Sequence, residues 1–386
     1  MALTRPILIA GAGIGGLTLA LLLARKGIKA VLIERAPRLE EVGAGIQLSP
    51  NASRVLDRLG LGPALDEAGV QPTHIRLIDG KSGAPLAQIP LGFAAERRWG
   101  APYRLIHRAA LQQILARAAE KAEVDLRLGT ELVDFAATAK GVVAHLRSAN
   151  VDESLGASAL VGADGVRSRV RTRMGAPDLT FSGQVAWRAT ISLPSPLETG
   201  VWLGPGAHLV TYPIDHSGTL NLVAVTRGKL SSANWSQTGS RSELLAAFKG
   251  WAPPVQRLLD TADIWLTWPL FDGRPAKIGE GRVTLIGDAA HPVLPHLAQG
   301  AGLAIEDAAV LAARLEEVPD DPAAAFRAYE NERAARTASV QSAARRNGEI
   351  FRLSGVAAFA RDAVLRVLGP ERLMARYDWV YGYRAR

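Results

Sequence analysis

The sequence predicts an α/β fold in which a parallel sheet is interleaved with a second, mixed or antiparallel sheet and followed by C-terminal helices. A glycine-rich strand, helix and strand open the chain at residues 5–34. Two further apolar strands, at 159–164 and 282–288, each end in an acidic residue. From residue 183 the pattern becomes that of successive antiparallel strands, and after residue 322 it is helical.

The composition is that of a soluble globular protein, with 48% hydrophobic and 21% charged residues among 386. This length suffices for one large domain or two medium ones. The absence of cysteine excludes disulfides, thiolate metal sites, iron–sulfur clusters and a cysteine nucleophile, and we expect no metal. The net charge of +8 favours small anionic partners over nucleic acid, because no basic stretch is interleaved with aromatics.

The uncharged run from Ile7 to Ala24 has the length of a membrane helix or a signal peptide. Five glycine or hydroxyl residues interrupt it, namely Gly11, Gly13, Gly15, Gly16 and Thr18. They divide the run into a strand and a helix, so we expect no membrane segment and a cytoplasmic protein.

The same segment carries a dinucleotide-binding pattern, G-x-G-x-x-G between a buried strand and a helix. Gly11 permits the tight turn, Gly13 lets the backbone approach a pyrophosphate, and Gly16 lets the helix pack on the strand. The helix N-terminus would hold the diphosphate, and Glu34, at the end of the second strand, would accept hydrogen bonds from ribose hydroxyls. A Rossmann-like site is therefore predicted.

A second glycine-rich loop, 43–50, leads into a helix for which Ser49 is the expected N-cap, Pro50 the first residue and Gly60 the end. This loop is either a plain connection or a close approach of backbone to a flat cofactor. Arg108 begins another helix, where a cation opposes the helix dipole. Its position indicates a partner anion, although a surface arginine is the alternative.

The stretch from Gly287-Asp288 to Gln299-Gly300-Ala301-Gly302 places an acid at a strand end, then a loop, then a helix N-terminus. The free N–H groups and positive dipole end of that helix would face the same space as the acid. Such a pocket suits a group that carries hydroxyls and becomes negatively charged. Taken alone, the pattern also fits any α/β crossover.

Antiparallel strands are predicted at 184–192, 200–203, 208–212 and 219–226. They carry five large side chains that either roof a substrate cavity or belong to the core: Trp187, Arg188, Trp202, His208 and Tyr212. A capping box from Ser240 to Glu243 precedes a helix at 244–248.

Four signals in this order resemble the class A flavoprotein monooxygenases, which have the para-hydroxybenzoate hydroxylase fold. They are Gly11–Gly16 with Glu34, Asp164-Gly165 with Arg167-Ser168, Gly287-Asp288 with His291-Pro292, and Gln299–Gly302. The resemblance covers the whole chain. The segments 43–47, 297–301 and 305–307 and the tail Tyr377–Tyr383 are similar to the salicylate 1-hydroxylase and 3-hydroxybenzoate 6-hydroxylase branch.

The resemblance implies a Rossmann-like FAD-binding domain of the GR2 type at 1–72, 100–180 and 275–320. A substrate-binding β-sheet domain would comprise 73–99 and 181–274, and a C-terminal helical segment 321–386. The implied cofactor-binding residues are Gly11, Gly13, Gly15, Gly16, Glu34, Arg35, Gln47, Arg108, Asp164, Asp288, Gly300, Ala301 and Gly302.

Among them, Arg35 would lie near the adenine, Arg108 near the phosphates and Asp288 at the ribityl chain, with the Gly300 helix facing the flavin pyrimidine edge. The Asp164-Gly165 segment is implied to serve both FAD and NAD(P)H. No second nucleotide fingerprint occurs, so NADH or NADPH is expected to bind transiently in a surface groove.

The implied reaction starts with reduction of FAD by NAD(P)H. O₂ then gives a flavin C4a-hydroperoxide, which hydroxylates a small phenolic acid. The same scaffold could instead act on a nitrogen heterocycle, such as a hydroxynicotinate or urate, or on a larger natural product. A third hypothesis is a non-catalytic basic protein that uses the βαβ unit structurally. The aromatic tail and the resemblance suggest a homodimer.

For substrate chemistry, the resemblance implies that His208 is the base or proton relay and that Tyr212 and Gln299 orient the ring, with Arg188 as a carboxylate contact. His208 and Tyr212 share one face of their strand. A hydrogen-bonded core imidazole is the alternative for His208. His296 departs from the family pattern and either changes the substrate or acts as the base itself.

Overall fold

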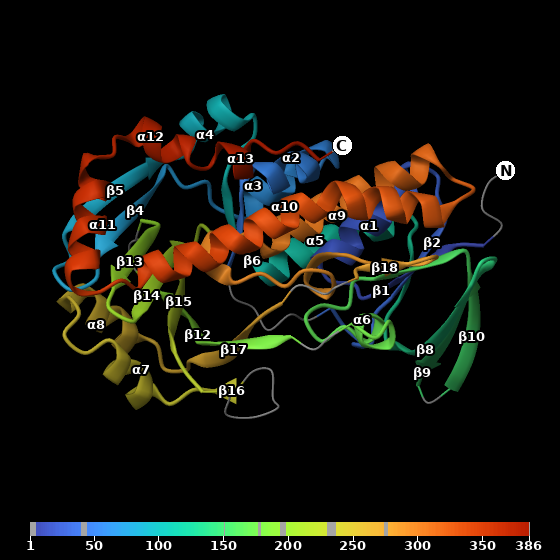
Figure 1. Cartoon of the computed structure of the whole chain (residues 1–386), viewed down its shortest axis with the longest axis horizontal. Helices are drawn as coiled ribbons and strands as arrows, with labels where there is room; N and C mark the ends of the chain where they lie inside the picture. Colours follow the sequence, from blue (N-terminus) through green and yellow to red (C-terminus); the bar gives the residue numbers. More distant parts are fainter. Residues whose placement is uncertain are drawn as a thin grey trace.

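The computed structural model describes residues 5–39, 45–149, 151–176, 179–193, 198–229, 237–273 and 277–385. The molecule is elongated, with a parallel sheet towards one end and a larger antiparallel sheet towards the other (Figure 1). Helix α10 (Pro322–Phe351) runs along both parts. Gly43 and Ala44 of the predicted second glycine-rich loop lie outside the described residues.

The parallel sheet has the strand order β18-β19-β11-β1-β2-β7. Its strands are β1 (Ile7–Ala10), β2 (Ala30–Ile33), β7 (Asp125–Arg127), β11 (Ala159–Gly162), β18 (Gly279–Glu280) and β19 (Val283–Leu285). Only the edge strand β18 runs antiparallel to its neighbour. The predicted strand, helix and strand at the start of the chain and the two strands that precede Asp164 and Asp288 are thus confirmed, and the four strands lie in one sheet.

Both faces of this sheet are covered, which explains the unbroken apolar run of β1. Ile7 and Ile9 pack under the helices α1 (Ile14–Arg25), α5 (Arg108–Lys121) and α9 (Gly300–Glu317). Leu8 and Ala10 face a three-stranded sheet of β8 (Thr130–Thr138), β9 (Gly141–Ser148) and β10 (Val151–Ala157). Strand β10 was not predicted, because its first four residues are exposed and its polar residues Asp152, Glu153 and Ser154 break any apolar alternation.

The antiparallel part is an eight-stranded sheet with the order β16-β17-β12-β15-β14-β13-β4-β5, in which only the β13–β4 pair is parallel. Its strands are β4 (His74–Asp79), β5 (Pro85–Pro90), β12 (Thr180–Ser192), β13 (Gly200–Gly204), β14 (Ala207–Pro213), β15 (Thr219–Arg227), β16 (Gln237–Thr238) and β17 (Leu266–Asp272). Helices α7 (Arg241–Ala247) and α8 (Pro253–Thr261) cover one face.

The two faces of this sheet separate the five large side chains that the sequence analysis singled out. Trp187 is buried in the core beneath α7 and α8, and the partly buried Trp202 packs against the same cluster. Arg188 follows Trp187 directly and therefore points to the opposite face, where Tyr212 also lies. The structure thus confirms the core interpretation for Trp187 and places Trp202 on the same face, away from the cavity.

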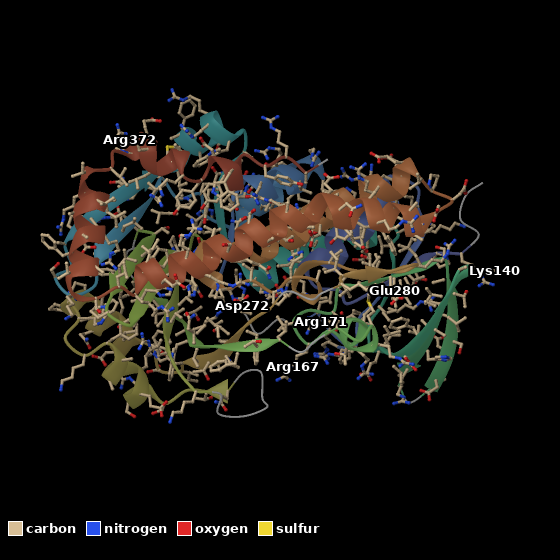
Figure 2. All side chains as sticks on the ribbon, viewed as in Figure 1. Lys140, Arg167, Arg171, Asp272, Glu280 and Arg372 are labelled. Carbon is tan, nitrogen blue, oxygen red and sulfur yellow. The ribbon has the colours of Figure 1, made fainter. Side chains whose placement is uncertain are left out.

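The remaining elements connect the two sheets and cover their outer sides. They are β3 (Gly45–Leu48), which pairs with β6 (Arg104–His107), the helices α2 (Pro50–Arg58), α3 (Gly62–Ala68), α4 (Phe93–Trp99), α6 (Arg169–Arg173), α11 (Gly355–Val367), α12 (Pro370–Ala375) and α13 (Asp378–Tyr381), and 3-10 turns at Gly287–Ala289 and Pro295–Leu297. Charged side chains such as Lys140, Glu280 and Arg372 lie on the outer surface (Figure 2).

Two predictions concerned the ends of helices, namely those of α2 and the start of α7. Ser49 occupies the position before α2, Pro50 is its first residue, and Gly60 follows its end with φ +70°, as predicted, but the Ser49 hydroxyl contacts Asn51 Oδ1 and caps no backbone N–H. The capping box at Ser240 is wrong, because the Ser240 hydroxyl contacts the Ser242 hydroxyl at 2.8 Å and caps no backbone N–H. No helix in the described part of the chain has the length and apolar character that a membrane span requires.

Candidate active site

A cavity of about 640 Å³ lies between the carboxyl ends of the parallel strands and the face of the antiparallel sheet that carries Arg188 and Tyr212. Its size is in the range of ligand sites. Fourteen of the predicted site residues line it: Gly11, Gly13, Gly15, Glu34, Arg35, Gln47, Arg108, Asp164, Arg188, Tyr212, Asp288, Gln299, Gly300 and Ala301. Gly16, Gly302, His208 and His296 lie behind this lining.

The glycine loop at the N-terminus of α1 forms one end of the cavity. Gly11 has φ +107°, and a Cβ atom there would lie 2.5 Å from the Ala163 carbonyl oxygen. A Cβ at Gly16 would lie 1.9 Å from the Gly11 carbonyl oxygen, whereas a Cβ at Gly13 would meet no protein atom within 4 Å. The fold itself thus requires the first and last glycines, while Gly13 leaves open space for a ligand.

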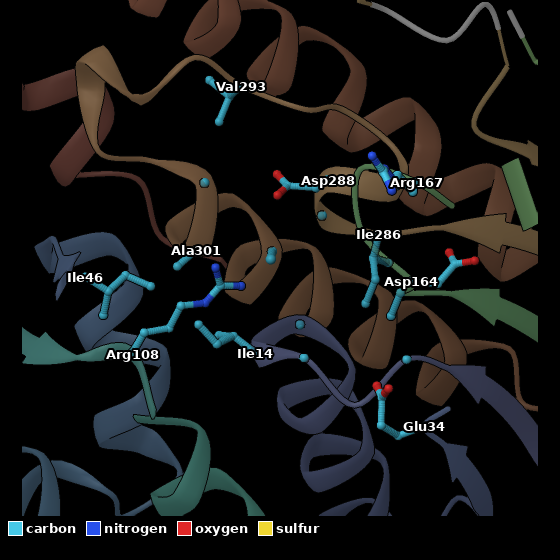
Figure 3. Close-up of a pocket in the computed structure, with 18 of the residues that line it drawn as sticks. Ile14, Glu34, Ile46, Arg108, Asp164, Arg167, Ile286, Asp288, Val293 and Ala301 are labelled. Atoms are coloured by element: carbon cyan, nitrogen blue, oxygen red, sulfur yellow. The ribbon is translucent and has the colours of Figure 1, made fainter. Parts of the chain in front are cut away.

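The carboxylate of Glu34 is held beside this loop at the end of β2 (Figure 3). Its Oε2 accepts from the Ala12 N–H at 3.0 Å and its Oε1 from the Ala36 N–H at 2.9 Å. These bonds fix the carboxylate and leave further lone pairs on both oxygens. The α1 N-terminus, which has no side-chain cap, also faces the cavity. This donor and acceptor set fits a dinucleotide diphosphate and its ribose.

Asp288 and Arg108 line the cavity from different elements and lie apart from one another (Figure 3). Burial raises the pKa of Asp288, and the charges of Arg108, His291 and Arg171 oppose that rise. Asp164 is placed differently from Asp288. Its Oδ2 accepts from the Arg169 N–H at 2.7 Å and the Val170 N–H at 3.2 Å at the start of α6, so part of its predicted cofactor-binding capacity is used by the fold.

The opposite wall carries Tyr212 and Gln47. The Tyr212 hydroxyl donates to the Gly45 carbonyl at 2.7 Å, and burial raises its pKa to about 12. A Cβ at Gly45 would lie 2.5 Å from the Tyr212 ring, so the close contact requires glycine. The Tyr103 hydroxyl donates to Gln47 Oε1 at 2.6 Å.

Gln299 differs from the expectation that its amide faces a ring. The side chain is fully buried, and its Nε2 donates to Ser49 Oγ at 2.9 Å. Its Oε1 accepts from Asn51 Nδ2 at 3.0 Å. Because both ends of the amide are hydrogen-bonded to residues at the start of α2, Gln299 fixes the start of α9 relative to α2.

His208 and His296 lie just behind the cavity wall, with ring centroids 5.0 Å apart. His208 is on the same face of β14 as Val210 and Tyr212, both of which line the cavity. His296 Nε2 lies 3.0 Å from Gln184 Oε1. A Cβ at Gly348 on α10 would lie 2.4 Å from the His296 ring, so α10 leaves space for it.

Both imidazoles are neutral near pH 7. Burial lowers the pKa of His208 well below its ordinary value, and the neighbouring His296 and Arg352 act in the same direction. Burial, with the charge of Arg352, lowers the pKa of His296 to about 3. A neutral imidazole has a lone pair that can accept a proton.

A buried charge cluster below the α9 N-terminus was not predicted from the sequence. It is formed by Glu306, Asp307, Arg333 and Arg336. Asp307 accepts from the Gly287 N–H at 2.8 Å and from Arg333 Nε at 2.7 Å. Glu306 pairs with Arg336 Nη2 and with Arg333 Nη2, both at 2.7 Å. The signal that could have revealed the cluster was Glu306-Asp307 within an otherwise apolar helix pattern.

His291 extends this cluster towards the cavity. Its Nε2 lies 2.6 Å from Asp307 Oδ2. Burial opposes ionisation of Asp307, but His291, Arg333 and these hydrogen bonds outweigh it and lower the pKa of Asp307 to about 2. The turn that carries Asp288 is thereby tied to α9.

Comparisons with known proteins show the family to which the chain belongs. Residues 4–344 match the family described as FAD binding domain. The chain is 36% identical to 3-hydroxybenzoate 6-hydroxylase of Klebsiella oxytoca, covering 100% of this chain and 98% of that protein. It is also 36% identical to 6-hydroxynicotinate 3-monooxygenase of Bordetella bronchiseptica, covering 87% and 89%.

A solved structure, Klebsiella pneumoniae HpxO complexed with FAD and uric acid, superposes with a TM-score of 0.85 at 26% identity over 97% of this chain and 96% of that chain. The chain belongs to the class A flavoprotein monooxygenases. It is an FAD-dependent NAD(P)H monooxygenase of the aromatic hydroxylase type.

The first prediction concerns the glycine loop. Gly13→Ala should weaken FAD binding about tenfold or more, a loss of ~1.4 kcal/mol, because its methyl group would enter the space of the diphosphate. The φ of −72° at Gly13 suits alanine, so the melting temperature of the FAD-free protein should change by less than about 2 °C. Titration of FAD-free protein with FAD and a thermal melt measure both quantities.

Gly16→Ala is the matched control, since its methyl group meets protein and not the cavity. It should lower the melting temperature of the FAD-free protein. Equal FAD affinity of Gly13→Ala and the wild type would show that the diphosphate does not lie at this loop.

The second prediction concerns the pH dependence of stability. The pKa of Asp307 lies below its ordinary 3.8, so its stabilisation is complete above that value and is lost as the pH falls towards 2. Asp307→Asn should lower the free energy of unfolding by about 3–5 kcal/mol at pH 7, because Arg333 loses a charged partner in a buried site.

Urea denaturation of both proteins at pH 8, 6 and 5 should give the same difference in unfolding free energy, and thermal melts below pH 4 a decreasing one. If the difference in unfolding free energy between the two proteins already decreases between pH 8 and 6, the pH dependence does not arise from protonation of Asp307.

Proposed function

We propose that this enzyme hydroxylates a small phenolic acid whose carboxylate is bound by Arg188. The observation that carries the proposal is a buried cation on the cavity wall. Arg188 lies over the Trp268 ring at 5.1 Å, and its Nε has no hydrogen-bond partner in the described residues. Burial lowers the pKa of this guanidinium, which nevertheless stays charged. A carboxylate in the cavity would compensate that charge.

The named relatives support the same substrate class. The protein from Klebsiella oxytoca is named for 3-hydroxybenzoate and that from Bordetella bronchiseptica for 6-hydroxynicotinate. Both compounds are aromatic acids with a ring hydroxyl. A cationic side chain for the carboxylate and a neutral base for the hydroxyl are the two features that such a molecule needs.

When bound, FAD supplies the redox and oxygen chemistry, using NADH or NADPH. Arg188 orients the ring through its carboxylate, and the apolar side chains Val210, Val223 and Val293 limit water in the cavity. His208 lies just behind the cavity lining, so we expect its neutral ring to take up the phenolic proton through an intervening water and not by direct contact. The free N–H groups at the start of α9 stabilise negative charge in the cavity.

A hydroxylated nitrogen heterocycle is the second candidate substrate. The feature that supports it is His296, which places a second neutral imidazole beside His208. Oxidation of NADH and of NADPH, with hydrogen peroxide counted, should be compared across salicylate, 3- and 4-hydroxybenzoate, hydroxynicotinates and urate. Fast oxidation with little peroxide would identify the substrate. No stimulation by any acid, with FAD bound, would contradict the proposal.

Two further parts of the proposal concern the surroundings of the enzyme. We place it in the cytoplasm, where NADH and NADPH are available. We also propose a homodimer, supported by the exposed apolar residues Val356, Phe359 and Val367 on one side of α11. The molar mass in solution, measured by sedimentation, tests the dimer.

The third prediction concerns Arg188. Arg188→Met should raise KM for the phenolic acid about 10- to 100-fold, the effect of losing one charge-assisted pair. The corresponding phenol without a carboxylate should show no such rise. Arg257→Met, on the outer helix α8, is the control variant. An unchanged KM for the acid would assign carboxylate binding to another residue.

The fourth prediction concerns His208. His208→Gln should retain FAD and slow hydroxylation by about 10²-fold or more, because a carboxamide cannot accept the phenolic proton. Product formation in single-turnover experiments measures this rate. If His208→Gln hydroxylates at the wild-type rate and His296→Gln does not, the base is His296.

A further inference from the structure

The aromatic tail Tyr377–Tyr383 is the sequence signal that the proposed mechanism does not use. None of its residues lines the cavity, and α13 packs beside α2 on the outer side of the molecule. We infer that this tail is a positioning element of the active site, because it holds two separate cavity walls through two chains of contacts. The measurement of peroxide release that tests this inference rests on the proposed function, whereas the measurement of FAD binding rests only on the family.

The first chain runs from the tail to the start of α9. Arg336 Nη1 donates to the Trp379 carbonyl at 2.7 Å, and Nη2 to the Val380 carbonyl at 2.9 Å. Nη2 also donates to Glu306 Oε1 at 2.7 Å. Asn51 Nδ2 donates to the same Glu306 oxygen at 2.6 Å and to Gln299 Oε1 at 3.0 Å.

The four side chains of this first chain are protected from water, although Trp379, where it starts, is 43% exposed. Glu306, Asn51 and Gln299 have no exposed surface, and Arg336 is 8% exposed. The Arg336 guanidinium also lies over the Tyr383 ring, 4.4 Å from its centre. In such a dry network hydrogen bonds and charges act strongly, and a missing partner is not replaced by solvent. Displacement of the tail would therefore deprive Arg336 of two acceptors and loosen its hold on Glu306.

The second chain runs from the tail to the opposite wall. Tyr381 packs edge-on against Tyr103, with ring centres 5.8 Å apart, and against Trp99 at 5.0 Å. The Tyr103 hydroxyl donates to Gln47 Oε1 at 2.6 Å, and Gln47 lines the cavity. Tyr103 is fully buried, so its ring position follows that of its neighbours.

The tail is itself held in place by polar contacts on its outer side. Arg98 forms two hydrogen bonds to the Asp378 carboxylate, at 2.6 and 2.7 Å. The Trp99 indole N–H donates to Asp378 Oδ1 at 2.8 Å. Arg54 Nη1 donates to the Tyr383 carbonyl at 2.7 Å. These contacts fix the backbone from which both chains start.

The test compares FAD binding by FAD-free full-length variants. Arg336→Met should weaken FAD binding about 3- to 30-fold, the range expected for coupling through an intermediate network. Because removal of a buried cation can prevent folding, Tyr381→Leu tests the second chain independently and should give a loss in the same range. Tyr381→Phe keeps the ring contacts and loses only the hydroxyl that interacts with Tyr103, so its loss of FAD affinity should be smaller than that of Tyr381→Leu.

A second readout separates positioning from mere stability. With the substrate identified, Arg336→Met and Tyr381→Leu should release a larger fraction of the consumed NAD(P)H equivalents as peroxide, because both cavity walls are less well defined. Circular dichroism well below the melting temperature establishes that the variants are folded. Arg372→Ala, at an exposed arginine of α12 (Figure 2), is the control and should match the wild type in both readouts.

Melting temperatures lowered in both variants, with wild-type FAD affinity and peroxide fraction, would overturn the inference and leave the tail a purely structural element. Failure of the proposed function is distinguishable, because it would appear as absence of hydroxylation in the wild type. The FAD titrations would still report on the tail in that case.

Discussion

The constraint on which the site depends is the neutralisation of four charges buried beneath the N-terminus of α9. Two carboxylates, Glu306 and Asp307, face two guanidiniums, Arg333 and Arg336, in a region without solvent. Such ions are tolerated only when each finds a partner of opposite charge and good hydrogen-bond geometry. That requirement fixes α10 relative to α9, and α9 in turn sets the 287–291 turn through Asp307.

This arrangement explains how one cavity can be built from parts distant in the chain. The glycine loop and Glu34 come from the first 34 residues, Arg188 and Tyr212 from the antiparallel sheet, and Asp288 from a late turn. Strand ends of a parallel sheet meet at one edge, which brings the acids together. The antiparallel sheet supplies the other wall because its side chains alternate, so Trp187 enters the core while Arg188 faces the cavity.

The nucleotide-binding half was predictable from sequence because its signals are local. The tight turn leaves no room for a side chain at positions 11 and 16, so glycine is required there. A strand that is buried on both faces is a continuous apolar run, which can be recognised without knowing what packs against it. The placement of Gln299 was not predictable, because its partners Ser49 and Asn51 are some 250 residues away in sequence. The same holds for His208 and His296, whose contact joins β14 to a turn before α9.

The missing side chain at Gly348 has a consequence for how such proteins diverge. The His296 ring occupies the volume that a β-carbon at position 348 would need. The constraint runs in one direction: a residue larger than glycine at position 348 requires a smaller side chain at position 296, whereas a smaller side chain at 296 is compatible with Gly348. In related sequences the residue at 296 should therefore have become smaller before, or together with, any enlargement at 348.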